Sequence, residues 1–217
     1  MAVVGIVPAA GSGERLGASQ PKAFALCAGR PLLDWSVDVL AEVCQRVVVA
    51  VPPGRERAPD RVRGGPSRSA SVRAALLAAP EATTVIVHDA ARPLLSRDLA
   101  ERCLAAVYEG WDGAVAAARM TDTVKQADRE GRVLRTLERS SLWSIQTPQV
   151  FRAEVLRRAL AVDEETLAAA TDDASLVEGA GGTVRVVEAP PENLKVTRAV
   201  DLELAGSLLM AARAGAV

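Results

Sequence analysis

Residues 5–24, GIVPAAGSGERLGASQPKAF, contain the residue types that bind phosphate. The stretch begins as an apolar run, turns on Gly11 and Gly13, and then places Arg15 and Lys22 seven residues apart. Glycines let backbone N–H groups approach an anion closely, and the two cations can neutralise the charge that develops on phosphate. The stretch therefore predicts a loop that grips the phosphates of a nucleoside triphosphate.

Two familiar phosphate-binding loops do not match this stretch. A Walker A loop requires GxxxxGK[ST], which the sequence lacks. A dinucleotide fingerprint requires a third glycine where this chain has Leu16, and an acidic residue at the end of the second strand, where it has AVPPGRER. The side-chain cations remain as the distinguishing feature of the loop.

The segment VIVHDAARP places a carboxylate, Asp89, at the end of a third predicted strand. A lone carboxylate there can hold Mg²⁺, which keeps several waters and takes its other ligands from substrate phosphates. A helix-capping or turn aspartate is the alternative, and the neighbouring triphosphate loop favours the metal. The single histidine, His88, could act as a catalytic base, but we favour a hydrogen-bonded structural imidazole.

The sequence shows no activated nucleophile, because it contains no GxSxG, no paired Cys and His and no HExxH motif. This fits transfer to a phosphate acceptor, since a phosphate monoester is largely dianionic near neutral pH and can attack without a base. Catalysis then consists of positioning and electrostatic stabilisation.

Apolar periodicity predicts strands that alternate with helices along the chain. The predicted strands cover residues 2–7, 46–51, 84–88, 113–118 and 183–188. The predicted helices cover residues 31–40, 71–79, 97–109, 152–161, 172–179 and 199–213. This pattern predicts one α/β domain over residues 1–217, with a mainly parallel sheet covered by helices on both faces. In such sheets ligands bind beyond the carboxyl ends of the strands.

The polar segment 119–147 interrupts this alternation. Two short extended runs flank a turn signal at Glu130–Gly131, which predicts a protruding β-hairpin arm. A surface excursion without a function is the alternative interpretation.

Composition narrows the class of protein. The chain is 49% hydrophobic and has a formal net charge of −1. Its arginines are dispersed among a nearly equal number of acidic residues, and aromatic residues make only 3% of the chain. A nucleic-acid-binding module is therefore disfavoured. No apolar run approaches the roughly 20 residues that span a bilayer, and the first residues lack the basic flank of a signal peptide. The scattered Cys27, Cys44 and Cys103 fit a reducing cytoplasm and argue against disulfides or zinc, and helical spacing predicts Cys103 as a buried core thiol.

Lysine is rare in this chain. Of 26 lysines and arginines, only Lys22, Lys125 and Lys195 are lysines. Coding bias explains the excess of arginine. Where arginine is the default cation, however, a retained lysine can mark a position that needs a compact ammonium.

A series of motifs carries a family resemblance: PAAGSGERLGASQPKAF, GGPSRSASV, VHDAARP, TDTVK, QTPQ, TDDASLVE and NLKVT occur in this order. Together they resemble the 2-C-methyl-D-erythritol 4-phosphate cytidylyltransferases of the non-mevalonate isoprenoid pathway, over nearly the whole chain. The first motif alone indicates only a nucleotidyltransferase. The resemblance implies a Rossmann-like nucleotidyltransferase fold and a homodimer formed through the arm. It also implies Mg²⁺-dependent transfer of a cytidylyl group from CTP to methylerythritol 4-phosphate, with release of pyrophosphate.

The resemblance also implies roles for residues on the nucleotide side. The residues that would line the nucleotide are Ala9, Ala10 and Gly11, with Gly65 and Ser71 helping to recognise cytosine. Those that would bind the triphosphate and stabilise the pentacovalent transition state are Arg15, Lys22 and Lys195. Asp89 would hold the metal.

On the acceptor side, the resemblance places Arg92 beside the acceptor. Thr123 and Arg139, on the arm, would reach the acceptor phosphate in the partner subunit's site. Thr147 and Thr171 match further acceptor-side positions. All three lysines of the chain lie inside motifs, although a solvated arm cation remains an equal interpretation for Lys125.

Three details bear on the choice between related activities. Pro66 stands after the two glycines of GGPSRSASV and lacks a backbone N–H, so cytosine selectivity would depend on neighbouring groups. Cytidylyltransferases for ribitol 5-phosphate tend to have AGG and HDSVRP, whereas this chain has Ala10 in AAG and residues 90–91 as Ala-Ala. A non-catalytic nucleotide-binding regulator would be expected to have lost Arg15, Lys22 or Asp89, and all are present.

Overall fold

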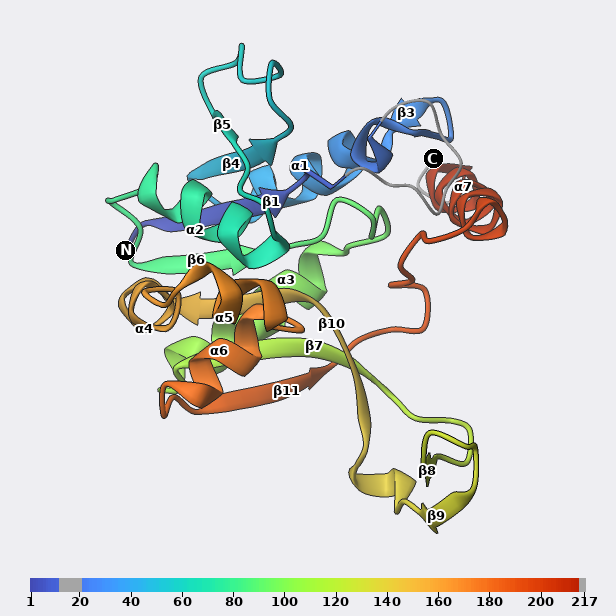
Figure 1. Cartoon of the computed structure of the whole chain (residues 1–217). Coiled ribbons are helices and arrows are strands. Elements are labelled where there is room, and N and C mark those ends of the chain that lie inside the picture. Colours follow the sequence, from blue (N-terminus) through green and yellow to red (C-terminus); the bar gives the residue numbers. More distant parts are fainter. Residues whose placement is uncertain (12–20, 215–217) are drawn as a thin grey trace.

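The computed structural model describes residues 1–11 and 21–214. Within these residues, seven strands form one sheet in the order β11-β7-β10-β6-β1-β4-β5 (Figure 1). Their bounds are β1 Val3–Pro8, β4 Arg46–Val51, β5 Arg61–Arg63, β6 Thr84–Val87, β7 Gly113–Arg119, β10 Trp143–Arg152 and β11 Val184–Glu188. Neighbouring strands run parallel except where β10 pairs with β6 and β7. The predicted α/β class with a mainly parallel sheet is confirmed.

Helices cover both faces of this sheet (Figure 1). Their bounds are α1 Leu32–Val43, α2 Arg68–Leu77, α3 Arg97–Tyr108, α4 Ala153–Ala159, α5 Glu164–Ala169, α6 Asp173–Gly179 and α7 Ala199–Ala214. One hydrophobic core joins the sheet to α2, α4, α5 and α6, and another joins it to α1 and α3. Successive strand side chains point to opposite faces, so Ile6 enters the first core and Val7 the second. The predicted core thiol is confirmed, since Cys103 of α3 is fully buried and burial raises its pKa to about 12.

The strand β10 is the main difference between the structure and the sequence-based prediction, which places residues 119–147 in the arm and a helix from residue 152. In the structure, Trp143–Ile145 already pairs with β7, so the arm shortens to residues 120–142. The first half of β10 alternates Trp143 and Ile145 with polar residues and is partly exposed where it leaves the sheet, and only its second half is buried. An alternation this short is a weak strand signal beside the polar arm.

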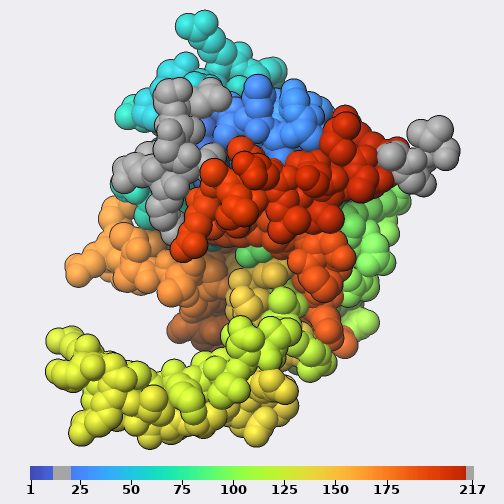
Figure 2. All heavy atoms as spheres, turned by 90° about the vertical axis from the view of Figure 1, so that its right-hand side faces the viewer, coloured from blue at the N-terminus to red at the C-terminus, as the bar shows by residue number. Residues whose placement is uncertain are grey.

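The arm itself is a hairpin of β8 Lys125–Ala127 and β9 Val133–Thr136, as predicted. Gly131 takes a positive φ of 85° in the turn between them, a conformation that favours glycine. Figure 2 shows the arm as a curved projection that stands off the rest of the molecule. Its tip exposes apolar side chains, with Val133 53% and Leu134 54% exposed.

The helix α7 closes the chain over a small third core. Ala205 and Leu209 pack against Leu32 and Trp35 of α1, beside the short hairpin of β2 Leu26–Cys27 and β3 Arg30–Pro31. The segment that leads to α7 crosses the carboxyl ends of the strands. It is tied there because the N–H of Val196 donates to the carbonyl oxygen of Ala91 at 2.8 Å. No helix in the described part of the chain combines the length and apolar character needed to cross a bilayer.

Candidate active site

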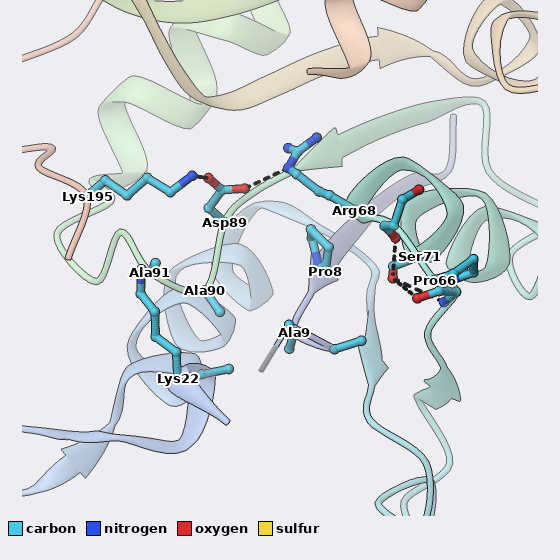
Figure 3. A pocket seen from close by; sticks show the side chains of 15 residues that line it. Pro8, Ala9, Lys22, Pro66, Arg68, Ser71, Asp89, Ala90, Ala91 and Lys195 are labelled. Carbon is cyan, nitrogen blue, oxygen red and sulfur yellow. Dashed lines mark hydrogen bonds and ion pairs between the residues drawn. The ribbon is translucent and has the colours of Figure 1, made fainter. Parts of the chain in front are cut away.

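A cavity of about 360 Å³ lies where β1, β5 and β6 end and α2 begins (Figure 3). Parallel strands present their carboxyl ends at one edge of a sheet, which places residues from distant motifs around this space. The predicted site residues that line it are Ala9, Ala10, Gly11, Lys22, Gly65, Ser71, Asp89 and Lys195. Arg15 lies outside the described residues.

The turn after β5 is built from two glycines for steric reasons. A Cβ atom on Gly64 would lie 2.4 Å from the Cβ of Ala10, and one on Gly65 would lie 2.6 Å from the Cβ of Ala70. Real Cβ atoms do not approach so closely, so a side chain at either position would push the turn away from β1 or α2. Gly64 thus lets the β5 turn pack against the loop after β1, and Gly65 lets it pack against α2.

The donors and acceptors of this turn are partly committed within the protein. The N–H of Gly65 donates to Oγ of Ser71 at 3.1 Å, and that hydroxyl donates to the carbonyl oxygen of Ser67 at 2.9 Å. Pro66, which also lines the cavity, has no N–H to offer. Residues 65 and 66 therefore have no free backbone donor for a ligand.

A second cavity of about 390 Å³ lies on the other side of Asp89. Three predicted acceptor-side residues line it, namely Arg92, Thr147 and Thr171. β10 contributes to this space because it runs antiparallel and so brings its first half, rather than its end, to the carboxyl edge of its neighbours.

Three charged residues line both cavities: Arg68, Asp89 and Lys195. Figure 3 shows them in a row, with the carboxylate between the two cations. The Nε atom of Arg68 donates to Oδ1 of Asp89 at 3.0 Å, and Nζ of Lys195 donates to Oδ2 at 2.7 Å. Burial alone would raise the pKa of the Asp89 carboxyl, but the two cations outweigh it and hold that pKa well below its usual range. The border between the cavities is therefore an ionised carboxylate flanked by two positive charges.

Arg68 was not singled out from the sequence, although it lies in the motif GGPSRSASV. Its Nη1 atom donates to Oδ2 of the fully buried Asp173 at 2.6 Å, so the guanidinium bridges two carboxylates. Burial alone would lower the pKa of Arg68, but Asp173 and Asp89 outweigh it and raise that pKa. One local feature of the sequence could have singled out Arg68. It is the first residue of α2, where the helix dipole disfavours a cation, so an arginine there indicates a partner elsewhere.

His88 is a structural imidazole, as favoured from the sequence. It is fully buried, and burial lowers its pKa to about 4, so the ring is neutral. The carbonyl oxygen of Arg92 lies 3.0 Å from Nε2 and can only accept, so Nε2 carries the proton. Nδ1 therefore accepts from the hydroxyl of Thr147 at 3.1 Å, and that hydroxyl accepts from the N–H of Asp89 at 3.0 Å. This chain of hydrogen bonds fixes the backbone of Asp89 against β10.

Arg92 lies at the second cavity and is held by the segment before α7. Its Nη1 atom donates to the carbonyl oxygen of Asn193 at 2.7 Å. The side chain of Asn193 in turn donates to Oε1 of Gln146 and to the carbonyl oxygen of Thr147. Burial lowers the pKa of Arg92, and Asp89 partly offsets this effect. These contacts place a buried cation next to the space predicted for the acceptor.

The two predicted arm residues are not brought to either cavity in the single chain. Neither Thr123 nor Arg139 is among the residues that line the two spaces. Arg139 begins a short 3₁₀ turn and donates through Nη1 to the carbonyl oxygen of Thr121 at 2.7 Å. Their predicted role in a partner subunit's site stays a prediction.

The donor set at the border fits one kind of metal ion. Among the described residues, no three His, Cys, Asp or Glu side chains gather into a protein-only metal site. A single carboxylate at the end of β6 matches Mg²⁺, which keeps several waters and completes its shell with substrate phosphates. Asp89 is the residue that fits this role, because it is ionised and lies on the wall of the cavity.

Known proteins resemble this chain in sequence and in fold. The sequence model for the family described as 2-C-methyl-D-erythritol 4-phosphate cytidylyltransferase matches residues 3–211. A relative of that name from Frankia casuarinae is 43% identical over 218 residues, covering 95% of this chain and 81% of its own. One from Rubrobacter xylanophilus is 43% identical over 222 residues, covering 96% of this chain and 95% of its own.

Solved structures of similarly named enzymes resemble the fold along nearly its whole length. The enzyme from Thermus thermophilus superposes with a TM-score of 0.82 at 36% identity, covering 96% of this chain and 98% of its own. The Francisella tularensis enzyme gives 0.80 at 31% identity, covering 95% and 99%. The chain belongs to the family of 2-C-methyl-D-erythritol 4-phosphate cytidylyltransferases.

Proposed function

We propose that this protein transfers the cytidylyl group of CTP to 2-C-methyl-D-erythritol 4-phosphate, giving 4-diphosphocytidyl-2-C-methyl-D-erythritol and pyrophosphate, for isoprenoid precursor synthesis in the cytoplasm. An oxygen of the 4-phosphate attacks the α-phosphorus of CTP, and the bond from that phosphorus to the β-phosphate oxygen breaks as pyrophosphate leaves. The observation that carries the proposal is the row of Arg68, Asp89 and Lys195 on the wall between two cavities, in a chain of this family. Two phosphorylated substrates can meet at such a border without a protein nucleophile.

The first cavity suits the nucleotide. The turn beside Ser71 offers a base no free N–H from Gly65 or Pro66, which suits cytosine, whose exocyclic amine is itself a donor, and disfavours uracil, which presents a carbonyl oxygen there. The compact backbone of Ala9, Ala10 and Gly11 leaves room for the ribose and phosphates. We assign the triphosphate to Arg15, Lys22 and Lys195, which would stabilise the charge of the pentacovalent transition state.

The second cavity suits the acceptor. Arg92 supplies a buried positive charge on its wall, and Thr171 supplies a hydroxyl for a polyol or phosphate oxygen. Thr147 orients Asp89 and His88 through its hydroxyl. We assign Mg²⁺ to Asp89, where the ion would neutralise charge on the triphosphate when bound.

Pyrophosphate release across a matrix of four nucleoside triphosphates and several polyol phosphates tests this activity. With Mg²⁺, the pair CTP and methylerythritol 4-phosphate should turn over far faster than any other. Equal or better turnover of ribitol 5-phosphate would overturn the acceptor assignment, and equal turnover of UTP would overturn the base assignment.

We also propose a homodimer formed through the arm of residues 120–142. The arm projects away from the body and exposes Val133 and Leu134, apolar surface that a second subunit would cover (Figure 2). Thr123 and Arg139 are on this arm and do not line the cavities of their own chain, so a role in catalysis requires a partner's site.

Subunit mixing tests the shared site. An Arg139→Ala chain and a Lys22→Ala chain should each be nearly inactive alone, because every site then lacks one group. Mixed heterodimers should regain activity, because both changes can fall in the same site and leave the other complete. No recovery after verified exchange would show that Arg139 serves its own subunit's site or none.

A further inference from the structure

The two cations that flank Asp89 are held very differently. Arg68 has a second carboxylate partner, because its Nη1 atom donates to Asp173 at 2.6 Å. The Asp173 side chain is fully buried at the start of α6, and its Oδ1 atom has no hydrogen-bond partner among the described residues. If Arg68 moved away, Asp173 would be left as a buried carboxylate without a compensating charge, which is strongly unfavourable. Arg68 is therefore a fixed partner of Oδ1 of Asp89.

Lys195 is held by much less. Its side chain is 43% exposed, and within the described part of the chain its ammonium makes a single ion pair, with Oδ2 of Asp89. Its backbone is anchored through the neighbouring Val196, whose N–H donates to Ala91, so the side chain can move while the backbone stays in place. The side chain has four flexible methylenes and lines both cavities. Lys195 is therefore an exchangeable partner of Oδ2.

We propose that Oδ2 of Asp89 is a shared position, held by the Lys195 ammonium in the ligand-free protein and taken by the divalent cation when the metal binds. This inference rests on the proposed function, since it takes Asp89 as the metal ligand. Oδ1 stays with Arg68, which keeps the carboxylate ionised and oriented throughout. The released ammonium then moves into the first cavity, which we assign to the nucleotide. Lys195 therefore becomes available to the triphosphate only when the metal site is filled. Arg68 and its anchor Asp173 are positioning residues in this scheme.

Metal binding without nucleotide tests the exchange directly, with Mn²⁺ as a paramagnetic substitute for Mg²⁺. Lys195→Met removes the competing ammonium but keeps a flexible side chain of similar length. Its affinity for Mn²⁺, measured from the free-ion signal in electron paramagnetic resonance, should be about two- to fivefold tighter than that of the parent, the range expected for one partly exposed ion pair. Lys125→Met, which removes the same charge from the arm, is the matched control and should bind Mn²⁺ like the parent. Equal affinity in Lys195→Met and the parent, or no Mn²⁺ binding by either, would overturn the exchange.

The scarcity of lysine allows a second test on the unmodified chain. Lysine labelled with ¹³C at Cε gives one signal for each of Lys22, Lys125 and Lys195, assigned from single substitutions. Titration with Mg²⁺ alone should move the Lys195 signal and leave that of Lys125 in place. A Lys195 signal that ignores Mg²⁺ while Mn²⁺ binds the protein would show that the ion does not displace the ammonium.

Urea unfolding tests the asymmetry between the two cations. Arg68→Met should lower the unfolding midpoint markedly or prevent folding, because it leaves Asp173 unpaired, whereas Lys195→Met should lower the midpoint much less, because it removes one partly exposed ion pair. Equal midpoints would refute the fixed role of Arg68.

Pyrophosphate release by the parent separates this inference from the proposed function. A parent that converts CTP and methylerythritol 4-phosphate while Lys195→Met binds Mn²⁺ no tighter refutes the exchange alone, and a parent that shows the exchange but releases no pyrophosphate refutes the proposed function alone.

Discussion

Replacing Thr147 by valine should destabilise the fold through two buried hydrogen bonds at once. The Thr147 side chain is almost fully buried, and its hydroxyl accepts from the N–H of Asp89 at 3.0 Å while donating to Nδ1 of His88 at 3.1 Å. Valine has nearly the same shape but neither donates nor accepts. The substitution therefore leaves one buried donor and one buried acceptor without partners.

The magnitude follows from those two groups. A buried polar group left unsatisfied costs about 1–3 kcal/mol, so the pair together costs about 2–6 kcal/mol. Small shifts of the loop after β6 would recover part of this, which favours the lower half of the range. Thr147→Ser keeps both hydrogen bonds and loses only a methyl group, at a cost of about 1 kcal/mol. The difference between Thr147→Val and the parent, which have nearly the same shape, isolates the contribution of the hydroxyl, and Thr147→Ser measures that of the methyl group.

Urea unfolding followed by circular dichroism measures this difference. With a slope of about 1–3 kcal/mol per molar urea, the unfolding midpoint of Thr147→Val should fall below that of Thr147→Ser by roughly 1 M. A Thr147→Val midpoint equal to that of the parent would show that the hydrogen-bond chain from Asp89 to His88 contributes nothing, and the positioning role of Thr147 would be refuted.

Three further predictions concern charge and protonation. Asp89→Asn should lower kcat by about 10²–10³ with circular dichroism unchanged, and near-normal turnover at ordinary Mg²⁺ would reduce the residue to a turn aspartate. Lys22→Arg should lose about as much in kcat under saturating substrates, because a broad planar guanidinium cannot replace a compact ammonium. The control Lys125→Arg should be tolerated. Activity of Lys22→Arg within a few-fold of the parent would leave coding bias as the explanation of the rare lysines. Burial lowers the pKa of His88 from its ordinary value of 6.5 to about 4. As the pH falls, His88 is therefore protonated in the unfolded chain before it is protonated in the folded protein. The free energy of unfolding should thus fall by about 3 kcal/mol between pH 6.5 and pH 4. Urea unfolding at several pH values should show that the free energy of unfolding falls less steeply with decreasing pH in His88→Gln than in the parent. The same pH dependence in both proteins would contradict a neutral, buried His88.

Local sequence determined the frame of this protein. Apolar runs such as residues 2–7 and 46–51 are strands because both their faces are buried, and that burial is visible as uninterrupted hydrophobicity. The glycine loops, the carboxylate after β6 and the three lysines could be singled out because their chemistry depends on residue type and position along the chain. The two glycines of the β5 turn illustrate this, since no other residue fits beside Ala10 and Ala70.

The tertiary structure alone decided which of these residues meet. Little in the local sequence distinguishes β10 from the arm that precedes it. Its first half is a short alternation of apolar and polar residues that pairs with β7 alone, while its second half pairs with both β6 and β7. The partnership of Arg68 with Asp173 joins residues that are 105 positions apart, and that of Lys195 with Asp89 spans 106. Such ion pairs depend on strand order and on the path of the chain across the sheet edge, and a buried charge is stable only where that path brings a partner to it. Residue type could therefore name Asp89 and Lys195, while the fold determined that Arg68 joins them and which carboxylate oxygen each cation holds.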